Sequence, residues 1–186
     1  MIDNDVVVRI KAGDREAFDI LVEEYQAQVV NIAYGMLSNR EDAFDAAQEV
    51  FIRIYKHIGG FRMDSALSTW IFKITKNVCT DFLRKRKDAV SLDVEDENKP
   101  KAEIEDRKHA PETAVERTET QRLVREAISQ MEENYRLVIT LFDIEGLSYE
   151  EIAAIIGCPV GTVKSRLARA REKLKQFFLK KREHIF

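Results

Sequence analysis

The sequence predicts an all-α protein with two small helical domains joined by an acidic flexible linker. Its 186 residues include only 7 Gly and 3 Pro, which leaves little punctuation for strands and hairpins. Long stretches instead repeat apolar residues at the three- and four-residue spacing of helices. Between these stretches, residues 88–118 are rich in acids, hold Pro100 and Pro111, and show almost no apolar periodicity. We therefore expect domains at residues 1–87 and 119–186.

Four amphipathic helices are expected in the first domain. The first begins near Val7 and ends at Gly13, and Asp14 is placed to cap the second. Asn39, with an acid three residues later, resembles a capping box and opens a third helix over residues 40–58. The fourth is expected over residues 65–87.

The second domain carries the signature of a helix-turn-helix. Ser148 and Glu151 form a capping box that starts one helix, Gly157 ends it, and Pro159 fits the first turn of the next. Two helices joined by so short a turn are typical of DNA-binding proteins, in which the second helix enters the major groove. Helices are expected near residues 112–130, 133–144, 148–156 and 160–180.

The second helix of this motif has separate apolar and polar faces. At about 100° per residue, one side gathers apolar residues that must pack inward, namely Val163, Leu167, Ala170 and Leu174. The opposite side is small and basic, and comprises Gly161, Ser165, Ala168, Arg169 and Glu172, flanked by Lys164, Arg166 and Arg171. Small residues allow close approach to base edges, and Lys or Arg can donate to guanine or phosphate. A plain helical hairpin with a solvated basic face is the alternative.

Net charge conceals two basic segments. The formal charge of the whole chain is only −3, yet residues 53–87 and residues 160–186 each hold 9 basic and 2 acidic side chains. Two separate basic blocks are expected of a protein that meets a phosphate backbone in two places. A single block of this kind would instead favour an ordinary solvated helix face.

Several other classes of protein and site are disfavoured. Cys79 and Cys158 lie far apart and form no ligand-spaced cluster with the three histidines, so we expect neither a disulfide nor a metal site. The sequence lacks a glycine-rich phosphate loop and a nucleophile with an adjacent base, so we expect no catalytic site and no cofactor. Without a long apolar run or a signal peptide, a cytoplasmic protein with no membrane insertion is expected.

Four segments together resemble the extracytoplasmic-function (ECF) sigma factors of bacterial RNA polymerase. Residues 147–174 look like region 4 of that family, and residues 45–55 are similar to its region 2.2. Residues 61–77, continuing to Asp81 and Arg84, are similar to regions 2.3 and 2.4, and residues 11–18 match the usual opening. Two departures are Ala46, where a larger aliphatic residue is common, and Met63, where glycine is frequent.

The resemblance implies a subunit, not an enzyme, that brings core polymerase to a promoter and helps to open the DNA. Its implied partners are promoter DNA, core RNA polymerase through the β′ coiled coil and the β subunit, and an anti-sigma factor. The residues implied to bind core polymerase are Asp45, Gln48 and Glu49. Those implied for the −10 element are Arg62, Asp64, Ser65, Lys73, Lys76, Asn77 and Arg84. Those implied for the −35 element are Lys164, Ser165, Arg166, Ala168, Arg169 and Arg171.

Two other hypotheses remain at this point. A dimeric regulator that binds a DNA palindrome would also use the helix-turn-helix, but it gives no reason for the match over residues 45–77. A helical adaptor or an enzyme with incidental charge would need a constellation of chemical groups that we do not find. Trp70 could serve as a stacking platform for a base, although its apolar position favours a place in the core.

Overall fold

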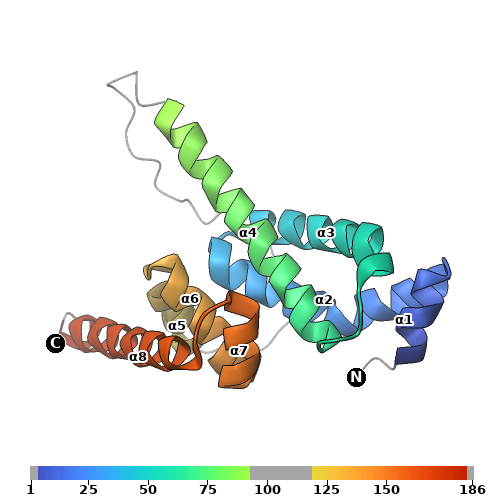
Figure 1. Ribbon diagram of the computed structural model, residues 1–186. Helices are drawn as coiled ribbons and strands as arrows, with labels where there is room; N and C mark the ends of the chain where they lie inside the picture. Colours follow the sequence, from blue (N-terminus) through green and yellow to red (C-terminus); the bar gives the residue numbers. More distant parts are fainter. Residues whose placement is uncertain (1–3, 93–118, 184–186) are drawn as a thin grey trace.

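The computed structural model describes residues 4–92 and 119–183, and all of its regular elements there are helical (Figure 1). The first domain contains α1 (Asn4–Lys11), α2 (Arg15–Leu37), α3 (Arg40–His57), the short 3₁₀ turn η1 (Ile58–Gly60) and α4 (Leu67–Leu92). The second contains α5 (Glu119–Ser129), α6 (Glu133–Ile139), the π-helical turn η3 (Thr140–Ile144), α7 (Tyr149–Ile156) and α8 (Val160–Glu183). The predicted fold class is confirmed.

Side-chain caps start the helices where the sequence predicts them. The Asp14 carboxylate accepts from the Ala17 amide at 3.2 Å, and the Asn39 side chain accepts from the Asp42 amide at 3.0 Å. These bonds satisfy amide donors that have no partner within the first turn of a helix. They therefore fix the starts of α2 and α3.

The core of the first domain is the bundle of α2, α3 and α4, which pack pairwise against one another. Each helix buries one apolar stripe in this core. The side chains that are 0% exposed include Leu21 and Val29 on α2, Val50 on α3, and Ile71 and Val78 on α4. Trp70 is half-buried, with its ring centroid 5.1 Å from that of Phe61. It belongs to the edge of the core, as its apolar position favours.

Three local expectations were wrong. α4 continues to Leu92, five residues into the predicted linker, because residues 88–92 contain neither Gly nor Pro to stop it. Residues 133–144 are not one α-helix, since Glu145 donates its amide to the Thr140 carbonyl at 3.0 Å across a π turn. Helical spacing predicts that Tyr55 lies with Phe51 and Ile54 on the apolar face of the third helix, but its side chain is 51% exposed. Residues 93–118 of the linker expected at 88–118, which include residues 112–118 of a predicted helix, lie outside the described residues.

The two domains touch in this structure. α7 packs against α4, while α6 and η3 pack against α2 (Figure 1). The C-terminal part of α4 projects away from the body, and α8 also extends outward from α7 (Figure 1). Both long helices thus keep one side open to solvent.

The capping box of α7 gives a direct test of how the helix-turn-helix is held. Ser148 accepts from the Glu151 amide at 3.2 Å, and Glu151 accepts from the Ser148 amide at 2.8 Å. Replacing Ser148 with Ala should lower the free energy of unfolding by about 1 kcal/mol, because the first-turn amide loses its acceptor. Ser148→Asp, which keeps an acceptor, is the control. Equal urea midpoints for Ala and Asp variants would contradict the assignment.

Candidate nucleic-acid interface and docking face

The helix-turn-helix is built as the sequence predicts. Gly157 ends α7 at φ +77°, a left-handed conformation that suits glycine, and donates its amide to the Ala153 carbonyl at 2.9 Å. α8 then begins directly after Pro159, whose carbonyl accepts from the Thr162 amide at 2.9 Å. Val163 and Leu167 are buried against the rest of the domain. Their burial turns the opposite side of α8 toward solvent.

A column of stacked groups, which the sequence did not reveal, locks α8 to the preceding elements. Lys164 Nζ lies 5.2 Å from the centroid of the Tyr149 ring, and this ring stacks on Phe142 at 4.9 Å. Arg171 lies 5.2 Å from the Phe142 centroid and pairs with Asp143 at 2.5 Å. The ion pair raises the pKa of the Arg171 guanidinium. The two aromatic residues were the only sign of this column in the sequence. Their stacking could not be predicted from it, because the contact between Phe142 and Tyr149 depends on the π turn.

The six side chains expected to meet the −35 element therefore differ in their surroundings. Ser165, Ala168 and Arg169 are exposed, and none of the described residues pairs with the Arg169 guanidinium. Lys164 and Arg171 are exposed but occupied by the stacked column, and Arg166 is half-buried. A small, exposed surface around Arg169 is thus the part of α8 free to approach a base edge.

The residues expected at the −10 element form a loop and a helix face. Arg62, Asp64 and Ser65 are exposed in the loop that leads into α4. Met63, between them, has φ +58°, a left-handed conformation in which glycine would be unstrained. The departure at Met63 thus falls where the backbone favours glycine.

On α4, three of the expected side chains share the solvent face. Lys73, Asn77 and Arg84 are exposed, whereas Lys76 is half-buried. Eleven residues at 1.5 Å per residue place Arg84 about 16 Å along the helix from Lys73. The face is therefore a strip along α4, long enough to follow a stretch of nucleic-acid backbone.

Ion pairs connect this strip to α3. Arg53 binds Glu49 at 2.7 Å and Asp81 at 3.2 Å, and Asp81 also accepts from Arg84 at 3.3 Å. Partly exposed pairs contribute little stability, on the order of 0.5 kcal/mol each, but they restrict where the side chains lie. Glu49, expected to meet core polymerase, is half-buried and lies at one end of this series of ion pairs, and Arg84 lies at the other end.

The outer side of α3 carries the other residues expected to bind core polymerase. Asp45 and Gln48 are exposed there. Beside them lie Phe44, 45% exposed, and Ile52, 46% exposed. Periodicity alone did not single out these two, because it identifies the apolar stripe that is buried and not a second, exposed one. The result is a mixed apolar and polar face of the kind found at protein interfaces.

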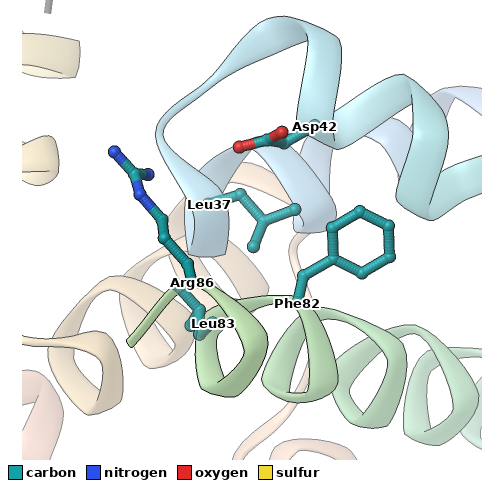
Figure 2. Close-up of a pocket in the computed structure, with 5 residues that line it drawn as sticks. All are labelled: Leu37, Asp42, Phe82, Leu83 and Arg86. Atoms are coloured by element: carbon teal, nitrogen blue, oxygen red, sulfur yellow. The ribbon is translucent and has the colours of Figure 1, made fainter. Parts of the chain in front are cut away.

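A cleft lies where α2, α3 and α4 converge. Figure 2 shows Leu37 opposite Phe82 and Leu83, with Asp42 on one side and Arg86 on the other. Its volume of about 270 Å³ is slightly below that typical of small-molecule sites, which start at roughly 300 Å³.

Within residues 4–92 and 119–183, no cluster of three or more His, Cys, Asp or Glu side chains could hold a metal ion. The described helices include none with the length and apolar character to cross a membrane.

The contact between the domains contains buried polar groups. Arg136 on α6 donates to the Met36 carbonyl at 2.7 Å, in the last turn of α2, and burial lowers the pKa of its guanidinium. Burial raises the pKa of the Glu145 carboxyl, and the nearby amides of Asn31 and Gln28 on α2 oppose that rise. These polar groups were not found from the sequence, since nothing in it indicates that α2 and α6 meet.

Comparison with known proteins places these features in one family. The sigma-70 region 2 model matches residues 21–89, and the sigma-70 region 4 model matches residues 121–174. The RNA polymerase sigma-H factor of Pseudomonas aeruginosa is 41% identical over 179 residues, covering 92% of this chain and 91% of that protein. The chain belongs to the ECF sigma factors of bacterial RNA polymerase.

Other family members support this assignment. The ECF RNA polymerase sigma-E factor of Escherichia coli K12 is 38% identical over 176 residues, covering 92% of each chain. The sigma factor RpoE of Bartonella quintana, solved in complex with the anti-sigma factor NepR, is 26% identical with a TM-score of 0.69. That match covers 87% of this chain and 96% of the other. Both helical domains therefore follow the architecture of ECF sigma factors.

Glu145 provides a pH-dependent test of the domain contact. A carboxyl whose pKa is raised in the folded protein contributes stability that is complete below its ordinary pKa and is lost as pH rises through the raised value. At about pH 7.5, Glu145→Gln should therefore be more stable than the wild type and unfold at a higher temperature. The gain in free energy of unfolding should be less than roughly 1 kcal/mol, because the side chain is half exposed. Near pH 4 the two proteins should match. A difference that is the same at both pH values would refute the burial of this charge.

Proposed function

We propose that this sigma factor uses three separate faces of its two domains to start transcription. The exposed side of α8 would read the −35 element, and the 62–65 loop with the outer strip of α4 would read the −10 element and hold the opened strand. The outer side of α3 would dock on the β′ coiled coil of core RNA polymerase, with further contact to the β subunit. The main support is that each DNA-facing helix buries its apolar stripe and leaves a basic side exposed.

The same proposal defines what the protein does not do and where it acts. Its role would be binding and positioning, with the chemistry of RNA synthesis left to the polymerase, so we infer that it is not an enzyme. We infer that it works in the cytoplasm, because polymerase and promoter DNA are there. An anti-sigma factor is a further proposed partner, since the Bartonella sigma factor of similar fold was solved with one.

The two DNA-facing surfaces should be separable by mutation. Arg169→Ala should relax sequence preference within the −35 element by about 1–3 kcal/mol, because it removes a donor to a base edge without disturbing the core. Asn77→Ala should alter preference only at the −10 element. The measurement is run-off transcription with core polymerase on a library randomised at both elements. A change in −10 preference from Arg169→Ala would reverse our assignment, and a uniform loss over all sequences would make Arg169 a phosphate contact.

The docking face on α3 should be testable without DNA. Asp45→Arg should weaken association with core polymerase at least tenfold, and Gln48→Ala less, because both groups are exposed on this face. Asp19→Arg, on the exposed part of α2, makes the same charge change elsewhere and serves as the control. Competition binding followed by gel filtration measures the affinity. Wild-type affinity for Asp45→Arg, or an equal loss for Asp19→Arg, would rule out this face.

A further inference from the structure

A second cleft lies where the C-terminal part of α2 faces α5 and η3. Tyr34 and Ser38 line it from the first domain, and Ile128 of α5 and Ile144 of η3 line it from the second. Its volume is about 130 Å³, close to the roughly 150 Å³ of a protein cavity that holds a benzene molecule. Sites for small molecules occur preferentially at contacts between domains. The size of this cleft therefore suits a ligand with one small ring.

Part of the lining is apolar and accessible. The side chain of Tyr34 is 36% exposed, and that of Ile144 is 53% exposed. Ile128, which is 7% exposed, adds apolar surface from α5. A planar apolar group that filled the cleft would remove this surface from water and could stack on the tyrosine ring. The lining therefore favours a ligand with a flat apolar body.

Arg125 gives the same cleft a positive charge. Its guanidinium is exposed, and none of the described residues forms an ion pair with it. Among the described residues, no acidic side chain lines the cleft. The nearby Glu145 carboxyl interacts with the side-chain amides of Asn31 and Gln28 on α2. A guanidinium can bind a carboxylate through two parallel hydrogen bonds, so the charge of the cleft complements that of a carboxylate.

The hydroxyl of Thr140 lies at the inner side of the cleft without a hydrogen-bond partner. Thr140 is 0% exposed, and its Oγ1 atom makes no hydrogen bond to any of the described residues. It faces Gly35 on α2, which also lines the cleft and where a Cβ atom would overlap this oxygen. A buried hydroxyl without a partner is destabilising, and a polar group that reaches it supplies the missing hydrogen bond. The cleft thus favours a second polar group at the inner end of its ligand.

We propose that this cleft binds a small carboxylate with a planar apolar body and a hydroxyl at its other end, of the size of para-hydroxybenzoate. The carboxylate pairs with Arg125, the ring packs on Tyr34 and Ile144, and the distal hydroxyl bonds to Thr140. This site lies apart from the three faces proposed to meet DNA and polymerase, so the inference goes beyond the proposed function and does not depend on it. Because the ligand contacts both domains, its concentration adds to the stability of the folded protein.

Titration of the full-length protein with para-hydroxybenzoate tests the site directly. Isotope-labelled isoleucine methyl groups, followed by NMR, report where the probe binds. Ile128 and Ile144 should shift with one dissociation constant of about 0.1–1 mM, as expected for a ligand of ten non-hydrogen atoms. Ile20, which is 44% exposed elsewhere on α2, should not shift. If Ile128 and Ile144 show no saturable shift up to about 10 mM probe, the site does not exist.

The charge requirement is tested with a neutral probe and a neutral variant. para-Hydroxybenzamide has nearly the shape of para-hydroxybenzoate without its charge, and should bind the wild type roughly fivefold or more weakly. Arg125→Gln should weaken binding of the carboxylate by the same factor and leave that of the amide unchanged. Arg15→Gln, at an exposed position at the start of α2, is the matched control. Equal affinity of the wild type for both probes, or an equal loss in Arg15→Gln, would overturn the assignment of an anion site.

The inner hydrogen bond is tested by removing a hydroxyl from the probe or from the protein. Benzoate lacks the distal hydroxyl and should bind the wild type about 3- to 10-fold more weakly than para-hydroxybenzoate. Thr140→Ala should abolish this difference, whereas Thr140→Ser, which loses the same methyl group and keeps the hydroxyl, should preserve it. Both variants are smaller than threonine at a site already close to Gly35, and circular dichroism checks that each is folded. If the difference persists in Thr140→Ala, the proposed orientation of the ligand is wrong.

Discussion

The burial of one apolar stripe on each long helix determines which side chains can meet nucleic acid. On α8, the stripe runs through Val163 and Leu167, and a turn of about 100° per residue then leaves Arg169 facing solvent. On α4, burial of Ile71 and Val78 leaves Asn77 on the outside in the same way. A change in either stripe would rotate the helix and withdraw its polar face, so core packing and DNA recognition are constrained together.

Charges on these helices divide into those that hold the protein together and those left for a partner. Arg171 pairs with Asp143 and lies over Phe142, so this basic group orients α8 on η3, the turn that precedes the helix-turn-helix. Lys173 and Lys181, farther along α8, pair with Glu132 and Glu126. The basic block in the sequence therefore overstates the charge available to DNA. Arg169, which is exposed and pairs with none of the residues that the structure describes, has more weight in recognition than the block as a whole suggests.

Local signals predicted most of the secondary structure, while contacts between distant segments were beyond them. Asp14, Asn39 and Ser148 mark helix starts through bonds that span three residues, and such short-range chemistry is legible in a sequence. The inward faces of α4 and α8 followed from periodicity for the same reason. The exposed Phe44 and the π turn after Ile139 could not be predicted, because each depends on which surfaces the tertiary fold brings together. The roles of the proposed DNA-binding residues come from the family resemblance and remain predictions.

Apolar packing is continuous across the two domains. Within each domain, helices meet through fully buried apolar side chains, and separating them would expose that surface to water. Between the domains, α2 meets α6 and η3 through Gly35 and the Arg136 guanidinium, and the buried apolar residues of both domains form one cluster. Separating the domains would therefore expose apolar surface as well as polar groups. The packing that aims the polar faces of α4 and α8 thus extends across the contact between the domains.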